Sequence, residues 1–341
     1  MPISFRSAIE RHCPAATIKK ADRGRARFQY SDWFRPFIRY FDDLINTNIE
    51  FFKHFKLCAE IQSFIQAQNE MDSPPSLYGL FENSHKPMRL SYLKPQIKLL
   101  NKFIKLVRDQ QNSSLIKEAI RSREEKSNDN FLSCKELENK LFQKYCKLLV
   151  LRIDLAIKPK IVDLAHNDLT DFNKSDFHAP HQLEYLKSKI AQLLENRRSN
   201  KTLKRIVGYM IKFEHGIKKG FHAHLILFLD GSKYANDSYY ADYITKYWTK
   251  LTDGKGCSYN CHRDKKKYRK LGIGLISYTE REKRDNLMIC IEYLCKTEQF
   301  FLFNRLGSTN YKRLQKSQPP EIEAGKIRVG RPRSTLGCEG E

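Results

Sequence analysis

Two histidines and a glutamate stand in a pattern that could hold a divalent metal ion. His222 and His224 alternate within the strand-like segment FHAHLILFLDG, and Glu214 ends the strand-like segment KRIVGYMIKFE before it. If the two segments form a hairpin symmetric about Lys218, Glu214 lies directly opposite His222, and His224 lies on the same face. Two imidazoles and one carboxylate leave coordination positions open for a substrate. An H-x-H pair alone is often incidental, and a register shift of one residue would separate the three side chains.

A tyrosine and a lysine further along the chain could supply a nucleophile and a cation. Tyr293 and Lys296 are three residues apart in DNLMICIEYLCKTEQF, whose apolar residues follow helical spacing. A tyrosine with a pKa of about 10 is a weak nucleophile at neutral pH. A metal ion that polarises a phosphate, together with a nearby cation, would make its attack feasible. The structural alternative is that Tyr293 only anchors the helix and that Lys296 is a solvated surface charge.

Apolar periodicity predicts the elements that must position these residues. From residue 145 onward the expected order is strand, helix, two strands, helix, strand and helix. The expected ranges are 147–157, 180–198, 204–214, 221–231, 237–251, 272–278 and 281–301. This order is that of a ferredoxin-like or RRM-like β-α-β-β-α-β core, an antiparallel sheet with helices packed on one face. We therefore expect an α+β fold of this type, preceded by a mostly helical N-terminal region.

Strand alternation divides the expected sheet into an apolar face and a charged face. In the segment at 147–157, the leucines and isoleucines at odd-numbered positions share one side, and Arg152 and Asp154 point to the other. Lys212 shares the charged side with Glu214 and the two histidines. We expect the helices to cover the apolar face, and Asp154 and Lys212 to lie around the metal ligands.

The acid, the histidines and the tyrosine together resemble a known family. The run from Glu214 to His222-Ala-His224 and on to Tyr293-Leu-Cys-Lys296 resembles the metal-ligand and nucleophile motifs of HUH endonucleases. These are the rolling-circle replication initiators of small phages, viruses and plasmids. Among these endonucleases, the chain more closely resembles the inovirus-type replication protein and its prophage relatives, the YagK/YfjJ C-terminal domain family. The motifs that carry this similarity are RIDL at 152–155, GFHAH at 220–224, DGKG at 253–256, GIG at 272–274 and KRDNL at 283–287.

The resemblance implies an activity and a role for each site residue. Tyr293 would attack a phosphate of single-stranded DNA, which gives a covalent 5′-phosphotyrosine and a free 3′-hydroxyl that primes synthesis. Glu214, His222 and His224 would bind Mn²⁺ or Mg²⁺, and Lys296 would stabilise charge or orient the phosphate. The resemblance therefore implies a metal-dependent nickase with strand-transfer and ligation activity, of the type that uses a single tyrosine.

A large excess of positive charge agrees with a nucleic-acid partner. The chain has 62 lysines and arginines against 39 aspartates and glutamates, a net charge of +23. A basic loop interleaved with tyrosines suits single-stranded DNA, because cations hold phosphates and aromatic rings stack on bases. An ordinary solvated loop is the equal alternative. The residues expected to contact DNA are Arg152, Lys255, Arg263, Lys265, Lys266, Lys267 and Tyr268.

The chain is expected to have three parts. Residues 1–140 form a helical region with an accessory or DNA-binding role, residues 145–305 form the nicking domain, and residues 306–341 form a flexible basic tail. No apolar run of about 18 residues and no secretory signal is found, so we expect a cytoplasmic protein without a membrane partner. The nine irregularly spaced cysteines indicate reduced thiols. A structural zinc site at Cys257, Cys261 and His262 is not expected, because no second pair of ligands lies at a suitable spacing.

Taken together, these features predict a replication initiator of a phage, prophage or plasmid. Its partners would be single-stranded DNA, the origin duplex, and a host helicase and polymerase, since the chain has no P-loop of its own. One alternative is a non-enzymatic nucleic-acid-binding regulator on the same fold, which would show salt-sensitive binding without cleavage. Another is a nuclease that uses water, whose cleavage would survive Tyr293→Phe.

Overall fold

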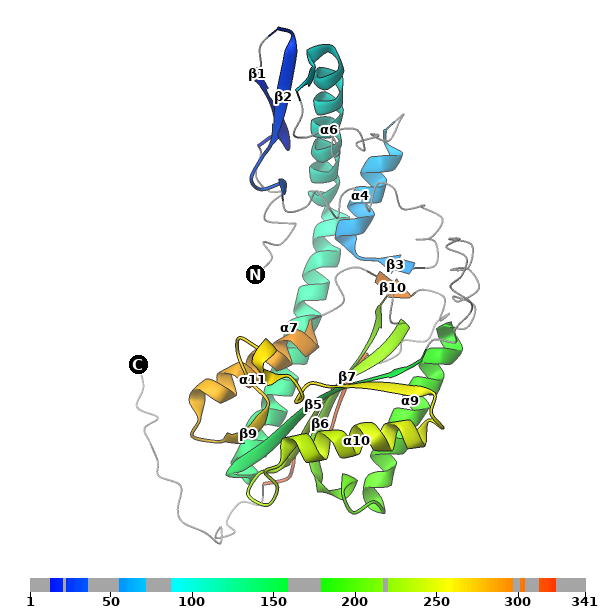
Figure 1. Cartoon of the computed structure of the whole chain (residues 1–341), viewed down its shortest axis with the longest axis vertical. Helices are drawn as coiled ribbons and strands as arrows, with labels where there is room; N and C mark the ends of the chain where they lie inside the picture. The colour runs from blue at the N-terminus through cyan, green and yellow to red at the C-terminus, as the bar shows by residue number, and fades with distance from the viewer. Residues whose placement is uncertain are drawn as a thin grey trace.

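The computed structural model describes eight stretches of the chain. These are residues 13–20, 23–35, 55–71, 87–158, 179–216, 220–296, 301–303 and 313–322. Their helices and strands form a smaller N-terminal lobe and a larger lobe built on one sheet (Figure 1). Within these stretches, no helix is both long and apolar enough to span a lipid bilayer.

The larger lobe is built on an antiparallel sheet of six strands. The strands run in the order β11, β6, β7, β5 and β8, and β9 pairs with β5 on the same side as β8. Their bounds are β5 Lys147–Ile157, β6 Ile206–Gly216, β7 Gly220–Asp230, β8 Gly256–Asn260, β9 Gly274–Ser277 and β11 Leu314–Lys316. The first and third strands of the β-α-β-β-α-β core, β5 and β7, therefore lie side by side in the centre. The predicted α+β fold with an antiparallel sheet is confirmed.

The outer edge of β5 has two partners. Residues 147–150 pair with β9, and residues 153–157 pair with β8. β8 lies in a segment that the sequence pattern predicts to be a polar loop. Its five residues pair with one strand only, and two of its three central side chains are exposed, so the segment lacks the apolar alternation of an interior strand.

One sheet face is apolar along its whole length. The leucines and isoleucines at odd-numbered positions of β5 pack there against helices α9 (Ala179–Glu195) and α10 (Asp237–Leu251). Trp248 of α10 is fully buried, and its indole N–H donates to the carbonyl of Ala156 at 3.1 Å. Two short 3-10 helices, η2 (Asn196–Arg198) and η3 (Leu203–Arg205), connect α9 to β6. This face is as the alternation of the strands predicts.

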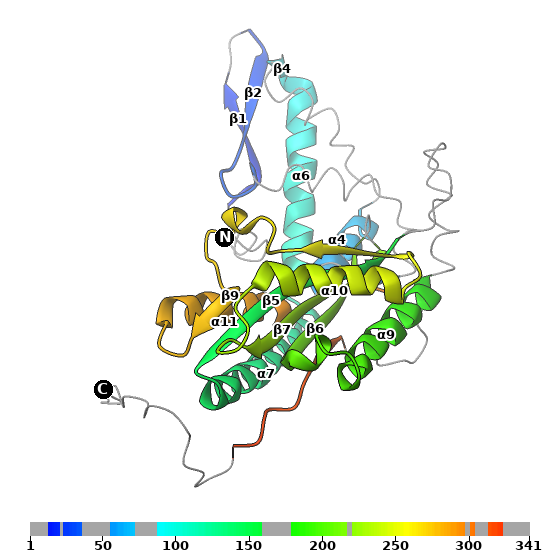
Figure 2. The same ribbon diagram turned by 60° about the horizontal axis from the view of Figure 1, so that its bottom comes forward.

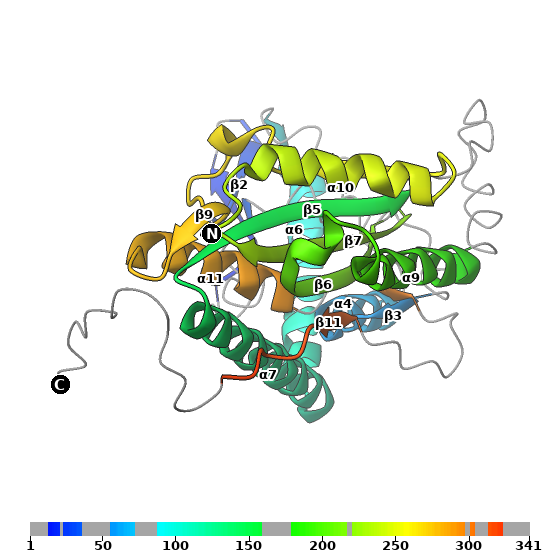
Figure 3. The same cartoon turned by 90° about the horizontal axis from the view of Figure 1, so that it is seen from below.

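The second face is divided along its length. At one end, Leu148, Val150 and Phe228 pack beneath α7 (Ser114–Lys144) and α11 (Arg281–Cys295). The two helices lie on the side of the sheet opposite α9 and α10 (Figure 3). The expectation that helices cover one face only is therefore wrong. The alternation marks the charged positions correctly, but the even-numbered positions at the start of β5 are apolar and need a cover of their own.

The helix α7 belongs with the sheet domain, although the expected boundary fell at 140–145. Its last turns, from Cys134 to Phe142, share a core with β5, β6 and α11. Buried Glu138 accepts from the guanidinium of Arg284 at 2.9 and 3.0 Å, which fastens α7 to α11. The sheet domain thus begins earlier in the chain than strand and helix patterns indicate.

The N-terminal lobe contains strands that were expected to be helical. A hairpin of β1 (Ala16–Lys20) and β2 (Arg25–Tyr30) pairs with the short β4 (Met88–Arg89). The alternate residues of β2 are buried with α4 (Ala59–Asn69) and α6 (Leu90–Gln111) in a core of their own. Figure 2 shows the hairpin alongside α6, away from the large sheet. The strand alternation in RARFQY is short, and it is outweighed in the sequence by the longer helical periodicity around it.

Three further segments near the C-terminal end differ from expectation. α11 ends at Cys295 rather than near 301, and Phe301–Phe303 forms β10, which pairs with β3 (Phe55–Leu57) of the N-terminal part. Residues 314–316, within the expected flexible tail, form the edge strand β11 against β6. Only three residues pair in each case, which is too few for a periodic signal.

The motifs GIG and KRDNL contact each other in the structure. A Cβ on Gly272 would lie 2.4 Å from the backbone of Asn286, so only glycine permits this approach of the β9 segment to α11. Gly274 has φ +97°, in the region that favours glycine. These two segments thus set how α11, which carries Tyr293, lies on the sheet.

Candidate active site

Three neighbouring strands bring polar side chains together at the open end of the second sheet face. Across the β6–β7 hairpin, Glu214 pairs with His222, and Lys212 pairs with His224. On the other side of β7, His224 pairs with Asp154 of β5. This is the register that the predicted hairpin requires, and it places all five side chains on one face.

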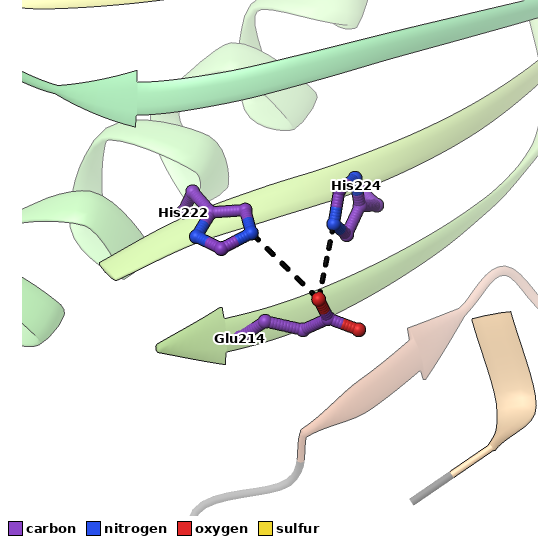
Figure 4. A group of neighbouring side chains, drawn as sticks. All are labelled: Glu214, His222 and His224. Carbon is purple, nitrogen blue, oxygen red and sulfur yellow. Dashed lines mark hydrogen bonds and ion pairs between the residues drawn. The ribbon is translucent and has the colours of Figure 1, made fainter. Parts of the chain in front are cut away.

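The expected ligands Glu214, His222 and His224 converge on one point. One ligand atom from each lies within 4.8 Å of the others, and no other such group of acidic, histidine or cysteine side chains occurs in the described stretches. Glu214 Oε2 is 3.1 Å from His224 Nε2 and 3.7 Å from His222 Nε2. Both imidazoles point toward that one carboxylate oxygen (Figure 4).

The charges of this group stabilise one another in the ionised form. Burial by itself raises the pKa of Glu214, but the two histidines and Lys212 outweigh it and hold the pKa well below its usual range. Burial by itself lowers the pKa of His224, but Asp154 and Glu214 raise it to about 9. At neutral pH the imidazolium of His224 therefore bridges two carboxylates, and a metal cation bound at Nε2 would replace its proton.

The donor set fits a divalent cation. Glu214 can offer a carboxylate oxygen, and His222 and His224 can each offer Nε2. The Nδ1 of His224 lies 2.5 Å from Asp154 Oδ1. Carboxylates orient metal-binding histidines through that second ring nitrogen. Asp154 therefore lies where the sequence pattern predicts, beside a ligand and not among the three.

Lys212 connects this group to the helix that carries the tyrosine. Its ammonium lies 2.6 Å from Glu214 Oε1 and donates to the backbone carbonyl of Lys296 at 2.5 Å. Its side chain is 7% exposed, so both contacts are shielded from water. Lys212 thus holds the end of α11 against the expected ligand Glu214.

Tyr293 lies under Arg152, close enough to Glu214 and Asp154 for their charges to act on its pKa. Its side chain is 53% exposed, and the guanidinium of Arg152 stands over the ring, 5.5 Å from the centroid. Partial burial raises the pKa of Tyr293, Glu214 and Asp154 raise it further, and Arg152 lowers it. The structure therefore brings together Tyr293, Arg152 and the three expected ligands.

The side chain of Lys296 pairs with Glu292 and, in the described structure, forms no ion pair with the expected ligands. Because α11 ends at Cys295, Lys296 has a backbone conformation outside the helical region, with φ −58° and ψ 126°. Its ammonium lies 3.3 Å from Glu292 and lines a cavity shared with residues of α7, including Ser127 and Phe131. The lysine that contacts the ligand group is Lys212, which sequence patterns place only near it.

The basic loop after β8 is more strongly tied to the protein than expected. Arg263 pairs with Asp242, Lys265 with Asp237, and Lys267 with Asp264. Tyr268 bonds to Cys261. Lys255, which directly precedes β8, stands 5.9 Å from the ring centroid of Tyr185. Lys266 is exposed. Tyr259 of β8 is exposed, and as the cross-strand partner of Asp154 it lies on the sheet face that carries the ligand group.

His262 has a role that its sequence context does not predict. Between β9 and β8, the backbone N–H of Arg152 has no strand partner and donates to His262 Nε2 at 3.0 Å. The other ring nitrogen donates to Asp237 Oδ2 at 3.0 Å, at the start of α10. The imidazole thus completes the edge of β5 beneath Arg152, and both of its nitrogens are used within the protein.

The fold and the site define an α+β domain with a carboxylate-histidine-histidine group and a tyrosine on one sheet face. A family model for the YagK/YfjJ C-terminal domain matches residues 110–308. The matched span starts just before α7 and includes every residue of the group. The chain therefore belongs to the YagK/YfjJ C-terminal domain family. Neither the curated proteins nor the solved structures gave a match.

Proposed function

We propose that this protein is a metal-dependent endonuclease, of the HUH type found in inovirus-type replication proteins, that nicks single-stranded DNA through Tyr293. The observation that carries the proposal is the group of Glu214, His222 and His224 together with the contact of Tyr293 with Arg152, which lies two residues from Asp154 on β5. A nucleophile, a metal-ligand set and a guanidinium are the parts that a phosphodiester transfer to a side chain requires.

In the proposed step the phenolic oxygen of Tyr293 attacks the phosphorus of one phosphodiester. An oxygen–phosphorus bond to the tyrosine forms, and the bond from phosphorus to the 3′ oxygen breaks. The phenol loses its proton and the leaving 3′ oxygen gains one, so the products are a 5′-phosphotyrosine and a 3′-hydroxyl. Attack by a 3′-hydroxyl on the phosphotyrosine would reverse the step and join strands.

The protein's own side chains prepare this step. Arg152 stands over the ring of Tyr293, favours the phenolate and can contact a phosphate. Lys212 fixes Glu214, and Asp154 fixes His224, which keeps the two ligands oriented. When bound by Glu214, His222 and His224, Mn²⁺ or Mg²⁺ would supply positive charge that polarises the scissile phosphate.

We further propose that the nick starts rolling-circle replication of a phage, prophage or plasmid in the cytoplasm. The free 3′-hydroxyl would serve as primer for a host polymerase, and a host helicase would separate the strands. The net charge of +23 supports binding to single-stranded DNA and to the origin duplex.

One observation favours the alternative of a DNA-binding regulator without catalysis. Burial and the charge of Glu214 raise the pKa of Tyr293, which disfavours the phenolate. A regulator on the same fold would bind DNA in a salt-dependent way and leave no nick.

The test incubates the full chain with labelled single-stranded DNA, as a pool of sequences that includes candidate origins, and Mn²⁺. A denaturing protein gel then shows whether label migrates with the protein. We expect a labelled band that is lost in Tyr293→Phe and His222→Ala and kept in Tyr239→Phe, since Tyr239 has a similar exposure of 54% on α10. Cleavage without a labelled protein band would indicate a water-using nuclease, and binding without cleavage would indicate the regulator.

A further inference from the structure

The N-terminal lobe concentrates the positive charge of the protein. Residues 13–20, 23–35, 55–71 and 87–111 contain thirteen lysines and arginines, two aspartates and two glutamates, a net charge of +9. One of the two aspartates, Asp32, already pairs with Arg35. These few segments thus hold a large share of the net charge of +23.

The outward face of the small sheet carries four of these cations, and we call it the basic sheet face. It consists of Lys19 on β1, Arg25 and Arg27 on β2, and Arg89 on β4, all of them exposed. Lys19 is the cross-strand partner of Arg27, and Arg25 is the partner of Arg89. Among the described residues, none of the four forms an ion pair with a carboxylate.

The pairing of like charges has no role in holding this sheet together. Side chains at opposite positions lie about 5 Å apart, and like charges there destabilise the sheet. Arg25 and Arg27 add a second repulsion about 7 Å apart along β2. The stability of the lobe comes from the inward face, where the alternate residues of β2 pack against α6. A polyanion lying across the outward face would replace this repulsion with attraction.

We propose that the basic sheet face binds the phosphate backbone of duplex DNA. The exposed neighbours of the cations on β1 and β2 are Thr17 and Gln29, and the aromatic residues of β2 point inward. The strands therefore offer cations and small polar groups for phosphates but no aromatic ring for stacking on unpaired bases. The assignment of DNA as the polyanion rests on the proposed nicking function.

The neighbouring helix carries further exposed cations next to β1. Lys94, Lys98, Lys102 and Lys105 are exposed on α6 at spacings of three and four residues. They lie on the flank of α6 that also carries Asn101, whose side chain bonds to the backbone of Ala16 on β1. A duplex held on the basic sheet face could therefore also contact this flank.

The test measures binding of the full chain to a labelled mixed-sequence duplex between about 50 and about 200 mM salt. The triple variant Arg25→Gln, Arg27→Gln, Arg89→Gln removes three proposed phosphate contacts. We expect the slope of log affinity against log salt to become shallower by about 2.7, which is about 0.9 for each contact. The triple variant Lys117→Gln, Lys126→Gln, Lys135→Gln removes the same charge from exposed positions of α7 and should leave the slope unchanged.

Stability and nicking provide independent readouts. Because like charges face each other, the variant Arg25→Gln, Arg27→Gln, Arg89→Gln should melt at no lower temperature than the parent at low salt. An unchanged slope in the arginine variant, or an equal change in both variants, would overturn the proposal. Loss of binding to phosphatidylserine vesicles by the arginine variant, with its duplex binding intact, would also overturn it. Formation of the Tyr293 adduct on single-stranded DNA is measured separately. A failure of duplex binding can therefore be told apart from a failure of nicking.

Discussion

At the scale of single residues, the site depends on how two neighbours hold the ligands. Asp154 fixes His224 through Nδ1 and leaves Nε2 directed at Glu214, while Lys212 holds the other oxygen of Glu214. Asp154 and Lys212 are not among the three expected ligands, yet Asp154 orients His224 and Lys212 neutralises part of the charge of Glu214. Tyr293, the proposed nucleophile on α11, and the cation of Arg152 on β5 complete the proposed site.

The first prediction concerns metal affinity. Asp154→Asn removes the carboxylate that orients His224 and favours its interaction with a cation, so Mn²⁺ affinity should fall by about 10- to 100-fold. Titration of the full chain with Mn²⁺, followed by electron paramagnetic resonance, measures this without any DNA. Asp285→Asn, an exposed carboxylate on the first turns of α11, is the matched control. Equal affinity in both variants would contradict the proposed role of Asp154.

The second prediction separates the two lysines near α11. Lys212→Gln removes a buried cation bound to Glu214 and should lower the nicking rate by about 10²-fold. Lys296→Gln removes an exposed cation paired with Glu292 and should change the rate by less than about threefold. Both rates are measured well below the melting temperatures, because breaking a buried ion pair also costs stability. The reverse order of effects would show that Lys296 serves the reaction after all.

At the scale of elements, the change of partners along β5 is what needs special support. The pairing of β5 with β9 ends at residue 150, and its pairing with β8 begins at residue 153. The imidazole of His262 completes the edge of β5 between them. Asp237, at the start of α10, fixes that imidazole and also pairs with Lys265. The position of Arg152, and through it the surroundings of Tyr293, therefore depends on this link between β5 and α10.

The third prediction uses the pKa of Asp237. Burial raises this pKa, but His262 and Lys265 outweigh it and hold it well below its ordinary value. A carboxyl whose pKa is depressed on folding stabilises the protein above its ordinary pKa and loses that contribution as pH falls through the folded value. Asp237→Asn should therefore lower stability by about 1–3 kcal/mol near neutral pH, and the difference from the parent should narrow below about pH 4.

Urea unfolding of parent and variant between neutral pH and about pH 3 measures this difference. Asp285→Asn provides a carboxylate control that forms no ion pair in the described structure. A difference that stays constant with pH would mean that the charge of Asp237 contributes nothing and that only its shape matters.

At the scale of the whole molecule, local patterns predicted the site better than the elements around it. The register of Glu214 against His222 follows from strict alternation and a short hairpin, so it could be predicted from the sequence. The ferredoxin-like order of the sheet follows from long periodic segments in the same way. Short strands such as β8, β10 and β11 pair over three to five residues and leave no periodic signal.

The contacts between distant segments could not be predicted from single segments. The position of α7 on the second sheet face depends on the ion pair between Glu138 and Arg284, two residues far apart in the chain. The position of Lys296 outside the helix depends on where α11 ends, and helix ends are the least certain part of a pattern. His262 looked like part of an incomplete zinc motif because its partners, Arg152 and Asp237, lie on other elements.

The most direct test of the nicking proposal is to locate the attached nucleotide. After reaction with single-stranded DNA and Mn²⁺, the protein is digested with nuclease and trypsin and the peptides are weighed by mass spectrometry. Cleavage after Arg284 and Lys296 gives a peptide, DNLMICIEYLCK, in which Tyr293 is the only tyrosine. We predict that this peptide gains the mass of a nucleotide 5′-phosphate. The same mass on a different tyrosine peptide, or a nick with no modified peptide, would contradict the account.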